Sequence, residues 1–263
     1  MAATAPLTIL GELVHNPIVR ERLQAQGARE ASLDIASAEV LATTVMITAH
    51  GASDAKRRQW QQSGFQIADG TCPLVRHAHA QLRALVAAGY TPVVIGQAGH
   101  VEVRGLMEDF PGANVINTRG DIALLPVAVR YGVISQTTQP IDRVRELVAE
   151  LRHARRQAEV RFVDTVCKPT KDRQSALQRL IVQVQVVVMV GGRASNNTRQ
   201  LVATCRAARK PALHIERAAE LVAEDFSDVE SVGVTAGTST LHQTVDAVVE
   251  RLRQISNRSF QNH

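Results

Sequence analysis

Aromatic side chains are scarce in this sequence. They make up 3% of its 263 residues, so a folded core has to be built from Val, Leu, Ile and Ala. Long apolar runs are absent too: the stretch from Leu180 to Val190 is short and is interrupted by Gln183 and Gln185, so it cannot cross a bilayer. The N-terminus lacks the basic and apolar regions of a secretory signal. We therefore expect no membrane segment and a location in the reducing cytoplasm.

Cysteine is also rare, and the three that occur are Cys72, Cys167 and Cys205. An odd number without an export signal argues against disulfides and favours metal ligands or nucleophiles. Cys72 and Cys167 each follow an aspartate by three residues, at Asp69 and Asp164, which suggests equivalent positions in two units. Cys205 lies in a helical pattern as a small buried residue. Iron-sulfur clusters need three or four thiolates, so the spacing alone does not establish a cluster.

The net charge of +5 raises the question of nucleic acid. The basic residues are scattered among acidic ones along helical stretches, which is typical of solvated helix faces. We expect no nucleic-acid partner, and a basic balance suits a small anionic substrate.

Helical stretches alternate with short apolar runs, which predicts an α/β fold with largely parallel sheets. The six runs that predict buried strands are Leu7 to Leu13, Thr44 to Thr48, Pro92 to Ile95, Tyr131 to Ile134, Val184 to Val190 and Ser231 to Val234. Helices are predicted at Arg76 to Ala88, followed by a capping Gly89, and at Ser175 to Val182. A helix, turn and strand recur in QAQGAREASL, VAAGYTPVVI and RAARKPALHI. We therefore predict three small α/β units at residues 1–71, 72–166 and 167–263, the last with a C-terminal helix.

Polar residues collect after the predicted strands, where ligands bind in open parallel sheets. They are His15-Asn16, His50-Gly51, His100 with Glu102, Gln136 to Thr138, Ser195 to Asn197, and Gly237 to Ser239. Histidines, hydroxyls, carboxamides and glycine N–H groups together suit a diphosphate. Glu102 is the natural acid of the set, because an ionised carboxylate would repel such a ligand. The remaining histidines are assigned structural or surface positions, namely His77, His79, His153, His214, His242 and His263.

Eight strings in order resemble the 4-hydroxy-3-methylbut-2-enyl diphosphate reductase family across nearly the whole chain. They are LVHNPIV, TAHGAS, DGTCPLV, GQAGHVEVRG, SQTTQ, DTVCKPTKDRQ, GGRASNNTRQL and VGVTAGTST. The resemblance implies three α/β units in pseudo-threefold arrangement around a central [4Fe–4S] cluster. It also implies the last step of the methylerythritol phosphate pathway, a reductive dehydroxylation that yields isopentenyl and dimethylallyl diphosphates.

The same resemblance assigns roles to individual residues. Cys72 and Cys167 resemble two of the three cluster ligands, and Glu102 resembles the proton donor, acting with Thr137 and His100. The residues that resemble the substrate site are His15, His50, His100, Thr137, Ser195, Asn196, Asn197 and Ser239. The substrate implied is an allylic diphosphate, and the electron donor implied is a ferredoxin or flavodoxin.

The sequence departs from the family at its beginning. Family members open with a Gly-Phe-Cys-x-Gly-type segment that supplies the first cluster ligand, whereas here Met1 falls just ahead of the first predicted strand. We expect an incomplete first unit that exposes apolar surface and a cluster site that lacks its third cysteine. The favoured interpretation is an ordinary reductase whose start lies further upstream. The alternatives are a non-catalytic diphosphate-binding homologue and an unrelated α/β enzyme, such as a phosphotransferase that uses the GGRASNN loop.

Overall fold

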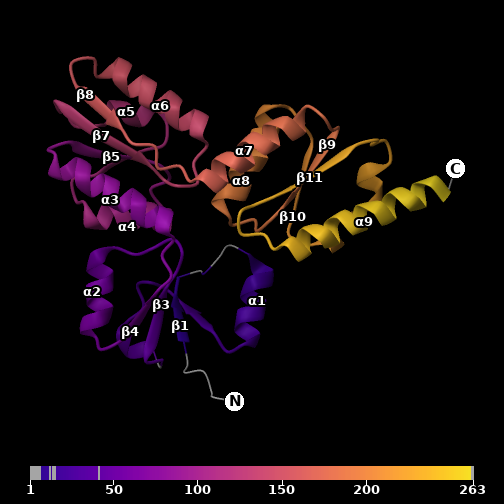
Figure 1. The fold of residues 1–263 in the computed structure, drawn as a ribbon, viewed down its shortest axis with the longest axis horizontal. Helices are drawn as coiled ribbons and strands as arrows, with labels where there is room; N and C mark the ends of the chain where they lie inside the picture. The colour runs from indigo at the N-terminus through magenta and orange to yellow at the C-terminus, as the bar shows by residue number, and fades with distance from the viewer. Residues whose placement is uncertain (1–6, 12, 14–15, 41, 262–263) are drawn as a thin grey trace. The chain divides into compact units, whose positions relative to one another are not determined.

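The computed structural model describes residues 7–11, 13, 16–40 and 42–261, and in them three separate sheets alternate with helices (Figure 1). Every strand pair is parallel. The prediction of an α/β protein with three small sheet units is confirmed, while the residue numbers at which one unit gives way to the next stay a prediction. The chain forms two compact units: Met1–Leu13 with Arg22–Cys167 (unit 1), and Val14–Glu21 with Lys168–His263 (unit 2).

Sheet 1 belongs to unit 1 and has the strand order β2-β1-β3-β4. The elements along this stretch are β1 (Leu7–Leu10), α1 (Pro17–Ala25), β2 (Arg29–Ala31), η1 (Ser37–Glu39), β3 (Thr44–Ile47), α2 (Asp54–Gln62) and β4 (Gln66–Asp69), and the part of α1 up to Glu21 belongs to unit 2. Ser53 is the N-cap of α2, and its side chain accepts a hydrogen bond from the Lys56 N–H. Trp60 of α2 packs with Leu10 and Val45 against the sheet.

Sheet 2, also in unit 1, has the order β6-β5-β7-β8. Its elements are α3 (Pro73–Ala87), β5 (Thr91–Ile95), α4 (Val101–Asp109), β6 (Asn114–Ile116), α5 (Arg119–Ala123), β7 (Arg130–Ser135), α6 (Ile141–Ala154) and β8 (Glu159–Phe162). The helices α3 and α4 cover one face and α5 and α6 the other, each with its own apolar cluster (Figure 1). The expected cap at Gly89 is confirmed, because Gly89 adopts φ +81° just past Ala88, the C-cap of α3.

Sheet 3 lies in unit 2 and has the order β10-β9-β11. Its elements are α7 (Lys168–Ile181), β9 (Val186–Val190), α8 (Asn196–Ala207), β10 (Ala212–Ile215), η2 (Ala218–Glu220), η3 (Ala223–Phe226), β11 (Val232–Ala236) and α9 (His242–Gln261). Cys205 is 0% exposed in the cluster between α7, α8 and the sheet, as expected for a buried apolar residue, and burial raises the pKa of its thiol.

All six strands predicted from apolar runs are present, and the recurring helix-turn-strand unit accounts for β2 and β10 as well. The strands that the sequence did not reveal are β4, β6 and β8, which all lie at sheet edges. An edge strand is covered on fewer sides, so its apolar pattern is weaker.

The expectation that the first unit exposes apolar surface stays a prediction, since Ile18, Val19 and Leu23 of α1 are only half-buried. The exposed large apolar side chains all lie outside residues 7–69, at Leu74, Val86, Leu124, Val127, Val129, Val182 and Val222. Leu33, Ile35 and Val40 pack on the cluster around Trp60. Among the described residues, none of the helices is long and apolar enough to cross a membrane.

Candidate functional site

The best-defined group of predicted site residues lies in unit 1, where the turns after β5 and β7 meet. Glu102, in the first turn of α4, is 1% exposed, and Thr137, two residues past β7, is 5% exposed. The Thr137 N–H donates to Glu102 Oε1 at 2.8 Å, and the Thr137 hydroxyl donates to Oε2 at 2.9 Å. They meet because β5 and β7 are adjacent strands with Ile95 paired to Ser135.

The Glu102 carboxyl is poised to exchange a proton near neutral pH. Burial raises its pKa from 4.5 to about 7, against the lowering effect of the two hydrogen bonds from Thr137 and of nearby His79. The acid and the carboxylate are then both populated at neutral pH. When Glu102 is protonated it donates to the Thr137 hydroxyl, whose own proton is then available to a further acceptor. The pair can therefore deliver a proton to a neighbouring acceptor while the Glu102 carboxyl itself stays buried.

Two of the predicted histidines lie together in unit 1. His100 is the N-cap of α4, with Nδ1 accepting from the Glu102 N–H at 3.2 Å. The neutral ring therefore carries its proton on Nε2. His50, three residues past β3, meets His100 edge to face with ring centroids 5.5 Å apart. The site residues from sheets 1 and 2 thus share one end of unit 1.

Cys72 and Cys167 occupy equivalent positions. Cys72 follows β4 and is the N-cap of α3, while Cys167 follows β8 and directly precedes α7. The Cys72 N–H donates to the Ala49 carbonyl at 3.0 Å, and the Cys167 N–H donates to the Thr137 carbonyl at 2.9 Å. Both thiols are half-buried. Each carbonyl belongs to a residue two positions past the third strand of its sheet.

The fit of these thiols to an iron-sulfur cluster is partial. Two half-buried cysteines at helix N-termini suit an anionic metal group. The third cysteine does not join them, because Cys205 is sealed in the aliphatic core of sheet 3. Within the described part of the chain, no three His, Cys, Asp or Glu side chains converge as a metal site would require. Cys72 and Cys167 are thus placed alike, and Cys205 is not.

In unit 2 the predicted residues gather at the first turn of α8. The Ser195 side chain caps the helix by accepting from the Thr198 N–H, and both Asn196 and Asn197 are at most 3% exposed. Asn197 Nδ2 and Thr198 Oγ1 are buried without a hydrogen-bond partner among the described residues. A buried polar atom normally has a partner, so these two mark a place for a ligand. The helix N-terminus and the unpaired donors favour an anion.

The turn after β11 closes on the same place. A Cβ on Gly237 would lie 2.2 Å from Thr198 Oγ1, so only glycine allows this approach. The carbonyl of Ser239 accepts from Asn16 Nδ2 at 2.8 Å, which ties the turn to the start of α1 within unit 2. The predicted residue His15 lies outside the described residues.

Sequence reasoning missed a role for His79. This histidine of α3 pairs with Asp109 at the end of α4, with His79 Nδ1 3.5 Å from Asp109 Oδ2, and it lowers the pKa of Glu102. Nothing in its local sequence signals this, because the pairing joins two helices that are separate in the chain. His214, by contrast, has the structural role expected of it, with Nε2 2.8 Å from the Gly191 carbonyl.

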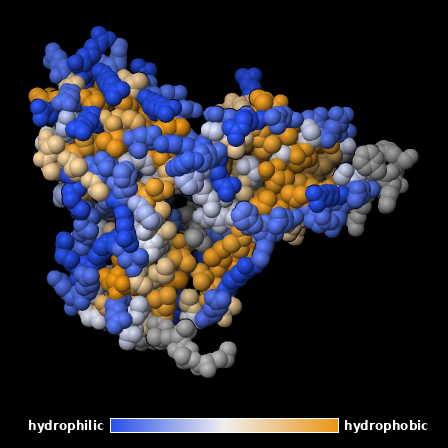
Figure 2. Space-filling view, in the orientation of Figure 1, coloured by the Kyte–Doolittle hydropathy of each residue, from blue (hydrophilic) through white to orange (hydrophobic). Residues whose placement is uncertain are grey.

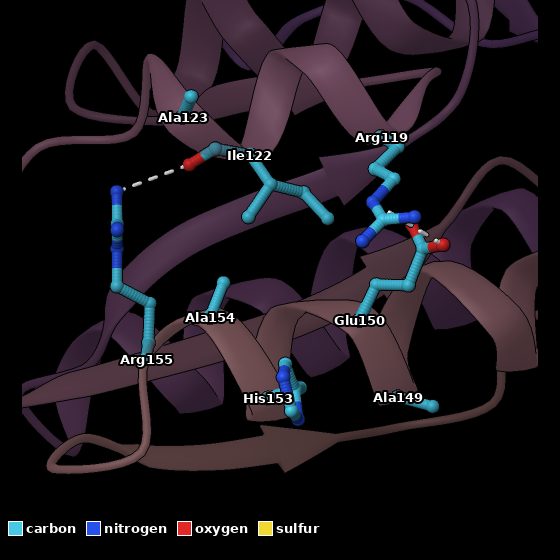
Figure 3. A pocket seen from close by; sticks show the side chains of 8 residues that line it. All are labelled: Arg119, Ile122, Ala123, Ala149, Glu150, His153, Ala154 and Arg155. Atoms are coloured by element: carbon cyan, nitrogen blue, oxygen red, sulfur yellow. Dashed lines mark hydrogen bonds and ion pairs between the residues drawn. The ribbon is translucent and has the colours of Figure 1, made fainter.

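A cavity of about 460 Å³ between α5 and α6 contains none of the predicted site residues (Figure 3). Arg155 donates to the carbonyls of Ile122 and Leu125 at the end of α5, and Arg119 pairs with Glu150 at 3.8 Å. These polar groups hold α5 on α6, so we assign the cavity no chemical role.

Comparison with known proteins identifies the family of this chain. The sequence pattern of the LytB protein family matches residues 1–253. The chain is 34% identical over 250 residues to the 4-hydroxy-3-methylbut-2-enyl diphosphate reductase of Geobacter sulfurreducens, which covers 95% of this chain and 87% of that protein. It is 35% identical over 252 residues to the protein of the same name from Anaeromyxobacter sp. (strain Fw109-5), with coverages of 95% and 87%.

Two solved structures are also similar. A structure of (E)-4-hydroxy-3-methyl-but-2-enyl diphosphate reductase, the terminal enzyme of the non-mevalonate pathway, matches with a TM-score of 0.66 and 31% identity over 96% of this chain and 90% of that one. The E-1-hydroxy-2-methyl-but-2-enyl-4-diphosphate reductase of Plasmodium falciparum shares the fold, with a TM-score of 0.87 and 24% identity over 94% and 78% of the two chains. The chain therefore belongs to the LytB protein family, and the relatives named above are diphosphate reductases.

Proposed function

We propose that this chain acts on 4-hydroxy-3-methylbut-2-enyl diphosphate and reductively removes its hydroxyl group. The carbon–oxygen bond breaks, two electrons and two protons are taken up, and water leaves together with isopentenyl or dimethylallyl diphosphate. Membership of the LytB family and the names of its relatives support this substrate. The observation that carries the proposal is the buried Glu102–Thr137 pair.

Glu102 is the proposed source of the proton that turns the leaving hydroxyl into water. A hydroxide is a poor leaving group, so a positioned acid lowers the barrier most when its pKa lies near the working pH. The pKa of about 7 for Glu102 meets that condition. Thr137 holds the carboxyl by two hydrogen bonds and passes the proton through its hydroxyl.

The α8 turn of unit 2 is the proposed place for the diphosphate, with Ser195, Asn196, Asn197 and Ser239 as its donors and His15 assigned to the same role. In unit 1, His50 and His100 are proposed to donate imidazole N–H groups to a phosphate of the substrate, and His100 also holds the first turn of α4. Hydroxyl, carboxamide and helix N–H donors spread the charge of a diphosphate over many hydrogen bonds.

Cys72 and Cys167 are the proposed protein ligands of a [4Fe–4S] cluster, and a third thiolate is still needed. When bound, such a cluster supplies the two electrons singly. The proposed electron donor is a ferredoxin or flavodoxin. The proposed location is the cytoplasm, because the three cysteines are thiols and the cluster ligands have to stay reduced.

The test is Glu102→Gln, assayed anaerobically after treatment with iron and sulfide in mercaptoethanol, a small thiol that can serve as the third ligand. Gln keeps the shape and an acceptor for the Thr137 N–H but cannot release a proton. We expect turnover to fall by about 100-fold or more while the affinity for the substrate is unchanged. The matched control is Glu146→Gln on the exposed side of α6, which should leave both unchanged.

The outcomes separate the two candidate functions. Equal loss of turnover and affinity in Glu102→Gln contradicts the proton-donor role. If the unsubstituted chain binds the substrate with no turnover, the non-catalytic diphosphate-binding alternative replaces the proposal.

A further inference from the structure

The segment between α5 and β7, which we call the exposed loop, holds large apolar side chains in the solvent. Among the described residues, four large apolar side chains are at least 80% exposed, and three of them belong to this loop: Leu124, Val127 and Val129. Figure 2 shows orange apolar atoms at the upper left, over the end of sheet 2, with blue hydrophilic atoms around them. A single exposed valine is ordinary, whereas a group of them with a polar rim marks an interaction surface.

Hydrogen bonds fix the backbone of the exposed loop. The hydroxyl of the buried Tyr131 donates to the Pro126 carbonyl at 2.6 Å and accepts from the Ala128 N–H at 3.2 Å. From α6, the C-cap residue Arg155 donates to the Leu125 carbonyl at 3.2 Å. The apolar side chains are therefore held outward by a preorganised backbone, so little conformational entropy is lost when they meet a partner.

A basic groove lies beside the exposed loop. It has a volume of about 830 Å³ between the loop and the end of α6, and its charged lining consists of Arg130, Arg155 and Arg156 together with His153. Among the described residues that line it there is no Asp or Glu. Arg152, in the last turn of α6, is exposed as well. Exposed apolar side chains beside a basic groove are complementary to a surface that has anionic groups over an apolar interior.

The exposed loop lies at the end of sheet 2 that is opposite to the candidate site. It precedes Arg130, the first residue of β7, whereas Thr137 and Cys167 lie past the carboxyl ends of β7 and β8. A strand of six residues spans roughly 17 Å, so an occupant of the groove leaves the Glu102–Thr137 pair of unit 1 uncovered. The same separation argues against the electron donor as the occupant, because it would be held away from Cys167.

We propose that the exposed loop and the basic groove bind the surface of a membrane that contains anionic lipids. Leu124, Val127 and Val129 enter the boundary between headgroups and acyl chains, while the arginines of the groove contact lipid phosphates. The nearly complete exposure of these apolar side chains favours lipid over an acidic protein. A folded protein needs a matching pocket for each protruding side chain, whereas a fluid lipid interface closes around it.

The first experiment is flotation of the full chain with vesicles of phosphatidylcholine alone, and with vesicles of phosphatidylcholine mixed with phosphatidylglycerol. We expect binding to the anionic vesicles only, and we expect added salt to weaken it, because the headgroup contacts are screened. A chain that stays off the anionic vesicles at low ionic strength would overturn the proposal. Equal binding to both kinds of vesicle would overturn it too, since the basic groove would then have no role.

Paired substitutions test whether binding occurs through this face. Val127→Asp with Val129→Asp removes apolar contact and adds negative charge, so the affinity for anionic vesicles should fall about 100-fold or more. Arg152→Gln with Arg156→Gln should lower it about 30-fold. All four positions are exposed, so the midpoint of thermal unfolding should not change. Undiminished binding by either pair would contradict the assigned surface.

Matched controls come from unit 2. Val182→Asp changes a valine that follows α7 and is 81% exposed, and Arg206→Gln with Arg209→Gln removes two exposed charges at the end of α8. These variants should keep most of the affinity of the native chain. Losses as large as those of the paired variants would show that binding follows net charge and not this face.

Tryptophan fluorescence separates insertion from a contact that is only electrostatic. The natural Trp60 is 3% exposed, so Val127→Trp adds a reporter at the most exposed apolar position. Anionic vesicles should shift its emission to shorter wavelength, and lipids brominated on their acyl chains should quench it, whereas Val182→Trp should show neither effect. Binding without that shift would overturn insertion of the loop. Binding to soluble polyglutamate but not to vesicles, lost in the arginine pair, would replace the lipid surface with an acidic protein partner.

Discussion

The turn between β5 and α4 and the turn between β9 and α8 hold equivalent places in sheets 2 and 3. A buried polar side chain is hydrogen-bonded in the first turn and unpaired in the second, among the described residues. Glu102 and Asn197 each lie six residues past the glycine that ends the central strand, Gly96 or Gly191. Glu102 has both oxygens bonded to Thr137. Asn197 Nδ2 is buried with no partner among the described residues.

The difference lies in the neighbouring turn. After β7, Thr137 is buried and reaches the carboxyl, whereas the equivalent Thr238 after β11 is exposed. A polar group whose hydrogen bonds are made within the protein can hold and pass a proton, but it has few hydrogen-bonding positions left for a ligand. An unsatisfied buried donor costs stability until a ligand fills it. The same scaffold thus forms a turn whose buried carboxyl is hydrogen-bonded in unit 1 and, among the described residues, a turn with unpaired buried polar atoms in unit 2.

The largest expected effect tests the turn between β5 and α4, called the closed turn because Glu102 is hydrogen-bonded within the protein. Because burial raises the pKa of Glu102 from 4.5 to about 7, the folded state holds this proton more tightly than the unfolded state does. The contribution to stability is complete below about pH 4.5 and is lost as the pH rises through about 7. The loss should be roughly 3 kcal/mol in the free energy of unfolding. Urea unfolding of the native chain and of Glu102→Gln across this range should diverge by that amount; parallel curves would contradict a buried, proton-holding Glu102.

The next effect tests how tightly the turn between β9 and α8 is packed. We call it the open turn, because Asn197 Nδ2 has no partner among the described residues. Gly237→Ala places a methyl group against Thr198 Oγ1 and should lower the free energy of unfolding by roughly 1–3 kcal/mol. Adding Thr198→Ala removes the clash, so most of the loss should be recovered in the double variant. Failure of that recovery would show that strain at Gly237 has another source.

A smaller effect tests whether the open turn awaits an anion. Asn197→Leu removes the unpaired donor without a large change in volume, so unfolding of the unliganded chain should change by less than about 1 kcal/mol. Its affinity for inorganic diphosphate, measured by calorimetry, should fall about tenfold, or about 1.4 kcal/mol. Asn257→Leu, at an exposed position of α9, is the matched control. Loss of stability with unchanged affinity would make Asn197 a structural residue.

The smallest effect separates the two hydrogen bonds of the closed turn. Thr137→Val removes the hydroxyl that lowers the pKa of Glu102 and keeps the backbone N–H that bonds Oε1. The pKa of Glu102 should therefore rise, and the pH at which stability is lost should move upward. Thr43→Val, at an exposed position beside β3, should leave that pH unchanged.

The fold was predictable where a strand is covered on both faces. The runs in β5 and β9 are nearly all aliphatic, because helices pack on both sides of them. The sequences of β4, QIAD, and β8, EVRF, alternate or are mostly polar, and only their pairing with β3 and β7 makes them strands. Edge strands depend on a neighbour that local sequence does not specify.

The site was predictable as a set of residues and less so as a set of contacts. Glu102, Thr137, His50 and His100 were all expected, and the structure brings them together at one end of unit 1. The contact of His79 with Asp109 was not expected, since it joins two helix faces whose packing is decided by sheet 2. The sequence likewise did not predict that Asn197 Nδ2 and Thr198 Oγ1 have no hydrogen-bond partner among the described residues. Whether a polar atom finds a partner depends on all the residues that pack around it.

The sequence by itself determined the family, the central strands and the places of Cys72 and Cys167, because short motifs and apolar periodicity are local properties of the chain. Only the tertiary structure decided the protonation of Glu102, since burial and two hydrogen bonds set its pKa. It also decided that, among the described residues, β11 is the last strand of its sheet, whereas β3 and β7 each have a further strand beside them. Desolvation and strand pairing arise between residues distant in sequence, and their effects exist only once the chain has folded.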